Sequence, residues 1–207
     1  IVNLVGTSID EYIRLAGRLS ECKHVAALEL NISCPNVEHG MNFATSPDLT
    51  GELVSAVKQA TEPPLITKLS PNVTDIVQIA IAAEQAGSDA LSLINTLVGM
   101  SIDVESRRPE LGNITGGLSG PAIKPVALRC VWEVFDAVDC PLIGMGGITS
   151  AEDAVEFFLA GASAIAVGTA NFVNPAAGAQ IASGLGDYCI EEGLGRLQEI
   201  VGAAHQS

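Results

Sequence analysis

The chain has 207 residues, 24 Asp and Glu against 10 Lys and Arg, and a formal net charge of −14. With 48% hydrophobic and only 16% charged residues, it is not an intrinsically disordered protein. The negative charge argues against nucleic-acid binding, and no apolar run approaches the ~18–20 residues that a membrane-spanning helix needs.

Short apolar runs alternate with amphipathic segments along the whole chain. In chain order, we expect strands at residues 1–5, 26–32, 65–69, 90–94, 141–144 and 164–167, with apolar residues on both faces. We expect helices at 8–20, 47–60, 73–86, 121–138 and 150–160, and a helical region from about residue 175 onward. Ser46 is the expected N-cap of the second helix, Trp132 is expected in the core, and four glycines should interrupt the last region: Gly184, Gly186, Gly193 and Gly195.

Strands that alternate with helices predict an α/β fold with a parallel sheet. We count about six βα units, whereas a closed TIM (β/α)₈ barrel has eight and ~250 residues. The chain is therefore either an open sheet or a barrel without two of its units, and its start inside a strand favours the barrel. We expect residues 1–207 to form a single, partial TIM-barrel domain that lacks the first two units.

The five cysteines include no CxxC pair, and their number is odd. This pattern favours reduced thiols in a cytoplasmic protein over a disulfide framework or a zinc site. His24, His39 and His205 do not have a metal-ligand spacing, so we expect no metal site.

Polar residues follow three of the expected strands, where barrel enzymes place their active sites. Asn31 and Asn36 flank Cys34, which can act as a base when deprotonated, although a buried structural cysteine between two turn-forming asparagines is an equal alternative. Lys68 ends the next strand and needs an anionic or electron-rich partner unless it only reaches out to the rim. Asn95 and Thr96 follow the fourth strand, ahead of a connection of about 25 residues that ends in a glycine-rich stretch.

Two glycine-containing stretches, residues 144–148 and 168–171, follow the last two strands. In barrels, the loops at these places bind phosphate through backbone N–H groups. The residues therefore predict a barrel-type enzyme with a phosphate-bearing cofactor, but they leave the cofactor and the substrate open.

The same stretches resemble class 1 dihydroorotate dehydrogenases, most closely the catalytic subunit of the NAD-dependent 1B type. The resemblance covers nearly all of the chain, in family order, and the longest match is at residues 113–127. The matching stretches are residues 31–36, 68–75, 94–96, 113–127, 144–147 and 164–172.

The resemblance implies an FMN enzyme that oxidises (S)-dihydroorotate to orotate in de novo pyrimidine (UMP) biosynthesis. Cys34 would remove the proton from C5 while a hydride passes from C6 to the flavin, and Lys68 would stabilise negative charge on the reduced flavin. The implied FMN-binding residues are Asn3, Asn31, Lys68, Ile94, Gly120, Gly146, Gly147, Gly168 and Thr169. The implied substrate-binding residues are Asn31, Asn36, Asn95 and Thr96.

The 1B type also implies a homodimer at the core of a heterotetramer, with a second subunit that carries FAD and a 2Fe-2S cluster and passes electrons to NAD⁺. Because the family has about two further βα units at its start, we expect this chain to bind FMN weakly and to turn over poorly by itself. Two alternatives remain, a pyrimidine-reducing flavin barrel like that of dihydropyrimidine dehydrogenase, and a non-catalytic barrel fragment. A generic phosphate-binding isomerase barrel would leave the Asn31, Cys34 and Asn36 cluster unexplained.

Overall fold

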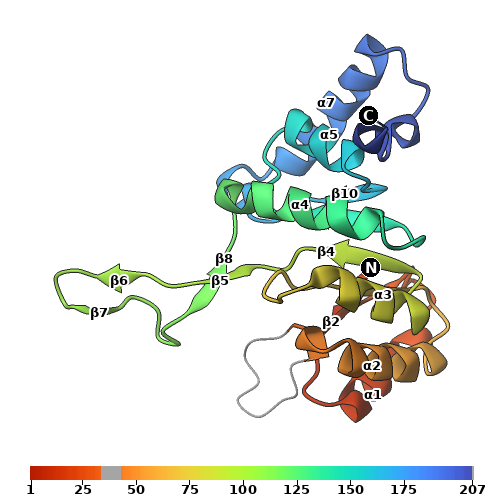
Figure 1. Ribbon diagram of the computed structural model, residues 1–207, viewed down its shortest axis with the longest axis vertical. Coiled ribbons are helices and arrows are strands. Elements are labelled where there is room, and N and C mark those ends of the chain that lie inside the picture. Colours follow the sequence, from red (N-terminus) through yellow and green to blue (C-terminus); the bar gives the residue numbers. More distant parts are fainter. Residues whose placement is uncertain (34–42, 207) are drawn as a thin grey trace.

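A computed structural model describes residues 1–33 and 43–206 (Figure 1). Its centre is a six-stranded parallel sheet whose strands pair in chain order. The strands are β1 (Val2–Leu4), β2 (Leu28–Asn31), β3 (Leu65–Lys68), β4 (Ala90–Leu93), β9 (Leu142–Met145) and β10 (Ala164–Ala166). The six predicted strands are thus confirmed, in the sequential parallel order of a partial barrel.

A helix follows each of the first five strands of this sheet. These helices are α1 (Ile9–Ser20), α2 (Pro47–Gln59), α3 (Ile76–Gln85), α4 (Lys124–Phe135) and α5 (Ala151–Leu159). After β10 come α6 (Ala170–Val173) and α7 (Ala177–Glu191), and four short 3₁₀ turns lie at η1 (Phe43–Thr45), η2 (Pro121–Ile123), η3 (Leu197–Ile200) and η4 (Ala203–His205). Consecutive helices pack against one another from α1 to α5, and α5 packs against α7 (Figure 1).

The starts of the helices follow from their capping residues. The predicted cap Ser46 accepts a hydrogen bond from the N–H of Leu49, and Ser150 forms a capping box with Asp153 at the start of α5. Helix α3 begins at Ile76 rather than at residue 73, because the side chain of Asp75 accepts from the N–H groups of the first turn and makes Asp75 the cap.

Two predictions about the second half of the chain differ from the structure. Of the four glycines expected to interrupt the last helical region, Gly193 and Gly195 do follow the end of α7 at Glu191, but α7 runs without a break through Gly184 and Gly186. A Cβ on Gly184 would lie 2.6 Å from the Cβ of Ala151, so this glycine lets α7 approach α5 closely. Trp132 is 39% exposed rather than in the core, and its ring stacks on that of His205 at 3.5 Å between centroids.

The strands of the sheet use their two faces differently. In β2, Leu28 and Leu30 are fully buried in the hydrophobic core, whereas the alternate residues Glu29 and Asn31 are partly exposed. Side chains alternate between the faces of a strand, so one face of β2 packs with the core and the other carries polar groups. This polar face includes the part of the sheet that holds the candidate site.

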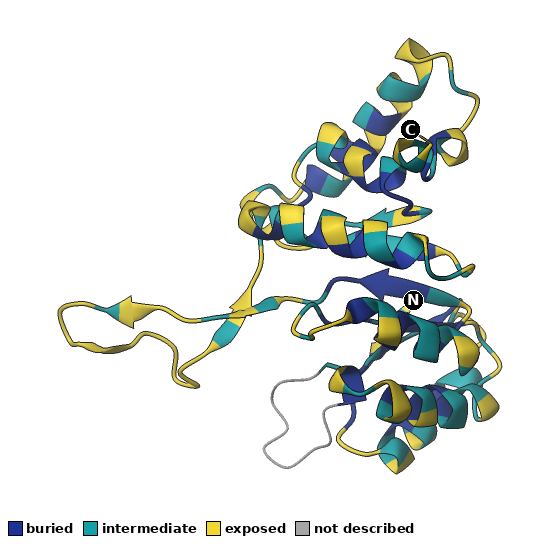
Figure 2. Cartoon of the chain, viewed as in Figure 1, coloured by how far each residue is buried: buried dark blue, intermediate teal, exposed yellow. Residues whose placement is uncertain are grey.

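The connection between β4 and α4 forms a long arm that projects from the body of the molecule (Figure 1). The arm consists of two antiparallel ribbons, β5 (Leu97–Gly99) with β8 (Gly116–Leu118) and β6 (Ile102–Asp103) with β7 (Arg108–Pro109). Most of its residues are exposed (Figure 2), including Val98, Met100, Ile102 and Val104. Within the described residues, no helix is both long enough and apolar enough to cross a membrane.

Candidate functional site

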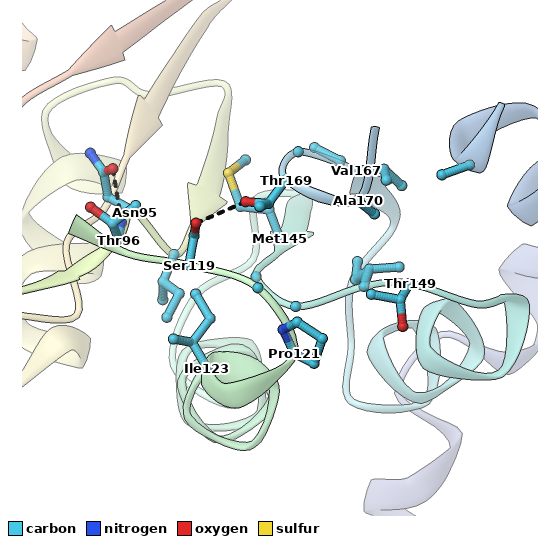
Figure 3. Close-up of a pocket in the computed structure, with 18 of the residues that line it drawn as sticks. Asn95, Thr96, Ser119, Pro121, Ile123, Met145, Thr149, Val167, Thr169 and Ala170 are labelled. Atoms are coloured by element: carbon cyan, nitrogen blue, oxygen red, sulfur yellow. Dashed lines mark hydrogen bonds between the residues drawn. The ribbon is translucent and has the colours of Figure 1, made fainter. Parts of the chain in front are cut away.

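A pocket of about 540 Å³ opens where β3, β4, β9 and β10 end (Figure 3). This volume lies within the usual range for small-molecule sites, and the location is the one that barrel enzymes use. The polar residues that line the pocket are Glu29, Lys68, Asn95, Thr96, Ser119, Thr149, Thr169 and Asn174. Apolar side chains such as Ile94, Ile123 and Met145 line the space between its polar parts.

One end of the pocket is built from amide and hydroxyl groups. Asn95 donates from Nδ2 to Asn31 Oδ1 at 3.1 Å and to Ser33 Oγ at 2.6 Å. Its Oδ1 accepts the N–H of Thr96 at 2.9 Å (Figure 3). Asn72 in turn donates to the carbonyl of Thr96 at 2.9 Å. The orientation of the Asn95 amide is therefore set by neighbours on both sides before any ligand arrives.

Lys68, the last residue of β3, is a half-buried cation at the floor of the pocket. Its Nζ lies 3.6 Å from Glu29 Oε1, so the anionic partner expected for this lysine is supplied by the chain itself. Among the described residues that line the pocket, Lys68 alone carries a positive charge. A half-buried cation beside an otherwise apolar wall favours electron-rich ligands.

The other end of the pocket is formed by the glycine loops, residues 144–148 and 168–171, together with Gly120. Gly146 and Gly147 have φ angles of +128° and +77°, which L side chains rarely adopt. A Cβ added to Gly120 or Gly168 would meet nothing within 4 Å. The backbone at these four glycines therefore reaches the pocket without a side chain in between, as an anion-binding loop requires. The hydroxyl of Thr169 donates to Ser119 Oγ at 2.8 Å and so connects the loop at residues 168–171 to the segment before Gly120 (Figure 3).

Behind the glycine loops, Asp153 ties three segments together. Its carboxylate accepts from Lys124 Nζ at 2.6 Å, from the N–H and hydroxyl of Thr149 at 2.8 and 2.7 Å, and from the N–H of Ser150 at 3.0 Å. Burial by itself would raise the pKa of Asp153, but hydrogen bonds from Lys124 and Thr149 outweigh it and lower the pKa to about 2. Hydrogen bonds to Asp153 and Glu156 raise the pKa of Lys124, so both partners stay charged over the physiological pH range.

The structure brings most of the predicted site residues together. Seven of them line the pocket, namely Lys68, Ile94, Gly120, Gly146, Gly147, Gly168 and Thr169, and so do the predicted substrate residues Asn95 and Thr96. Asn3 and Asn31 lie one side chain away from it, since Asn3 donates to Glu29 and Asn31 accepts from Asn95. Cys34 and Asn36 lie outside the described residues.

Sequence reasoning missed Glu29, Ser119 and Thr149. Glu29 had a signal, because a carboxylate between two leucines of an expected buried strand needs a partner. Ser119 and Thr149 had none beyond their position next to the glycine-rich stretches.

Two described thiols are chemically unsuited to be a base. Burial raises the pKa of the Cys130 thiol, and burial together with the nearby Glu84 carboxylate raises the pKa of Cys140 to about 12. Among the described residues, no group of three or more His, Cys, Asp or Glu is arranged to hold a metal ion.

This combination of a sequential parallel sheet and a pocket with an amide end, a lysine and glycine loops is that of a barrel-type enzyme, and the pocket suits an anionic, partly apolar ligand.

Comparisons with known proteins agree with an enzyme of this kind. Residues 1–188 match the family described as dihydroorotate dehydrogenase. The chain is 60% identical over 208 residues to the dihydroorotate dehydrogenase B (NAD(+)) catalytic subunit of Desulforudis audaxviator. It is also 60% identical over 204 residues to that of Pelobacter propionicus.

The alignments cover 100% and 98% of this chain, and 68% and 67% of those two relatives. A crystal structure of DHODH from Eimeria tenella in complex with ferulenol has the same fold, with a TM-score of 0.82 at 24% identity over 98% of this chain and 60% of that one. The chain belongs to the dihydroorotate dehydrogenase family, which is a family of oxidoreductases. The predicted resemblance to the NAD-dependent B type and the predicted partial-barrel fold are confirmed, and neither alternative function gains support.

Proposed function

We propose that this chain binds FMN in the pocket and oxidises dihydroorotate to orotate, as the catalytic subunit of an NAD-dependent dihydroorotate dehydrogenase. The observation that carries the proposal is a pocket that is lined by an amide cluster, Lys68, apolar side chains and a set of glycine loops. On this proposal, residues 1–207 act as one FMN-binding partial-barrel domain.

The residues of the pocket fit FMN in chemical kind. The phosphate would be held by the backbone of Gly146, Gly147, Gly168 and Thr169, because Lys124, which packs next to Gly147, is already paired with Asp153 and Glu156. The apolar walls formed by Ile94, Ile123 and Met145 suit a flat aromatic ring. FMN would supply a two-electron acceptor, and the positive charge of Lys68 would favour negative charge on the ring.

Asn95 and Thr96 are proposed to bind the substrate, with Asn31 and Asn36 beside them. Amide donors and acceptors match in kind the carbonyl, N–H and carboxylate groups of a pyrimidine acid. Because both donors and the acceptor of Asn95 already have partners in the chain, the substrate would replace some of these hydrogen bonds. The hydrogen bond between Asn31 and Asn95 holds both amides in a fixed orientation, so less ordering is needed when the substrate binds.

Cys34 is proposed as the base that removes the C5 proton. This role comes from the family resemblance. Among the described residues, no other cysteine lines the pocket.

The relatives are named catalytic subunits, so the chain belongs to a protein type with a partner. We propose a homodimer that binds an electron-transfer subunit with FAD and a 2Fe-2S cluster, which reduces NAD⁺ in the cytoplasm. The exposed apolar residues of the arm, from Val98 to Val104, offer a surface for subunit contacts. Sedimentation of the chain alone and with that subunit tests both assemblies.

The test of the proposed reaction is a visible spectrum of the purified chain after incubation with FMN, followed by anaerobic addition of dihydroorotate. We expect the flavin band to bleach in the unaltered chain and to persist in Cys34→Ala. Uracil with a nicotinamide donor serves as the comparison substrate. Because weak binding is expected of this chain by itself, FMN is supplied in excess. A chain that reacts only with uracil, or that binds no flavin even in excess FMN, would contradict the proposal.

A further inference from the structure

Glu29 is a carboxylate within β2, an inner strand of the sheet, and the proposed function gives it no role. Its side chain is 14% exposed and lines the floor of the pocket, while its neighbours Leu28 and Leu30 are buried on the opposite face of β2. Holding a charge at such a position is unfavourable unless partners compensate for the lost hydration. The partners of Glu29 therefore indicate what it does.

Glu29 is held in place by neutral donors from both neighbouring sides of the sheet. Asn3 of β1 donates to its Oε1 at 2.5 Å, and the hydroxyl of Ser92 in β4 donates to its Oε2 at 2.9 Å. Asn3 lies directly opposite Glu29 in the register of β1 and β2. The carboxylate is thus fixed by strand geometry, independently of the lysine near it.

Lys68 lies against this fixed anion, with its Nζ 3.6 Å from Glu29 Oε1. Ser92, which donates to Glu29, is also the register partner of Lys68 in β4. Four adjacent strands therefore contribute to one small group in which a single positive and a single negative charge face the pocket together. At this separation the two charges largely cancel for any group further away.

We propose that Glu29 is a positioning residue that acts through Lys68 and limits the positive field that the lysine presents to the bound flavin. This inference rests on the proposed function. By itself, Lys68 would favour the negatively charged reduced ring over the neutral oxidised ring. With Glu29 beside it, the preference is weaker, and the flavin passes its electrons on more readily.

The pair can be tested with three variants that change charge more than shape. Glu29→Gln removes the negative charge and can keep both hydrogen bonds, because its Oε1 can accept from Asn3 while its Nε2 donates to the hydroxyl of Ser92. Lys68→Met removes the positive charge and keeps an unbranched side chain of similar length. The double variant removes both charges, so the pair becomes neutral again.

The first readout is the midpoint potential of the bound FMN. We expect Glu29→Gln to raise it, by about 30 mV for each tenfold gain in affinity for reduced over oxidised FMN. Lys68→Met should lower it, and the double variant should return most of the way to the value of the unaltered chain. The matched control is Glu84→Gln, since Glu84 accepts two backbone hydrogen bonds at the start of the β9 segment and does not line the pocket. The control should leave the potential unchanged.

The second readout needs no flavin and is the urea midpoint of unfolding. Each single variant leaves one half-buried charge without its partner, so each should lower the midpoint, and the double variant should lower it by less than the sum of the two. Additive effects, or a Glu29→Gln potential that falls or stays unchanged, would overturn the inference. A chain that retains no FMN would instead overturn the proposed function and the flavin role with it. In that case the unfolding cycle still decides whether Glu29 and Lys68 act as a pair.

Discussion

Asp153 offers a quantitative test of how the glycine loops are held. The substitution Asp153→Asn keeps the shape of the side chain but removes the charge that pairs with Lys124 at 2.6 Å. The asparagine can still accept hydrogen bonds from Thr149 or Ser150, so the change isolates the charged part of the network. The carboxylate is 14% exposed, which means that little of this interaction is screened by water.

The pKa of Asp153 gives the magnitude. Its fall from an ordinary value of 3.8 to about 2 corresponds to about 2 kcal/mol of stability, at about 1.4 kcal/mol for each tenfold change in the protonation equilibrium. Because the pKa is lower in the folded chain, this stability is present in full above pH ~4 and is lost as the pH falls toward ~2. The network is therefore expected to weaken in acid.

The assay is urea unfolding of both proteins at several pH values. At about pH 7, Asp153→Asn should be less stable by about 2 kcal/mol, and the difference should shrink steadily below pH ~4. Glu133→Gln is the matched control, because Glu133 pairs with Arg129 on the surface of α4 with 41% of its side chain exposed, and such pairs contribute under about 1 kcal/mol. A difference for Asp153→Asn that does not change with pH would refute the argument.

Four further predictions concern the pocket and the thiols. Gly147→Ala should lower stability by about 2 kcal/mol or more, because its Cβ would lie 2.9 Å from the carbonyl of Gly120 at a φ of +77°. Gly168→Ala, whose Cβ meets no other residue, should instead unfold within about 0.5 kcal/mol of the unaltered chain and bind FMN at least about tenfold more weakly by fluorescence titration. Asn95→Ala should weaken orotate binding by about tenfold in a spectral titration, while the variant still binds FMN. Because its pKa is raised to about 12, the Cys140 thiol should react with a thiol reagent near pH 8 only after unfolding, whereas the exposed Cys22 should react in the folded chain.

The alternation of strands and helices could be predicted because each element has a local signal. The strands are short apolar runs, and Ser46 and Ser150 stand at helix starts as caps. Gly184 shows where local signals fail. Its low helix propensity predicts a break, but the close packing of α7 on Ala151 requires a residue without a side chain, and the helix continues. Ala151 lies 33 positions before Gly184 in the sequence. This separation is larger than the window of about 11–18 residues in which hydrophobic periodicity is read.

Parts of the site could be predicted, where the residue type or its place at the end of a strand indicates a function. Gly146 and Gly147 adopt positive φ angles that favour glycine, so the residue type itself predicts a special backbone there. Lys68 and Asn95 are polar residues at strand ends, and this position predicts that they line the pocket, as they do. The arm could not be predicted, because its short ribbons have neither apolar alternation nor a core to pack against. The network around Asp153 depends on Lys124, which is brought near only by the packing of α4 beside the loop before α5.

Glu29 connects these observations, because it shows how one strand serves two purposes. Barrel interiors are usually filled by layers of Val, Ile and Leu. Here the pocket face of the sheet carries Glu29 and Lys68 on β2 and β3, but Met145 and Ala166 on β9 and β10. The opposite face of β2 is leucine. Because residues alternate, the pocket can be polar toward the amide end and apolar toward the last two strands while the opposite face of the sheet packs against the helices. Packing against the helices and the chemistry of the pocket therefore fall on alternate positions of the same strand.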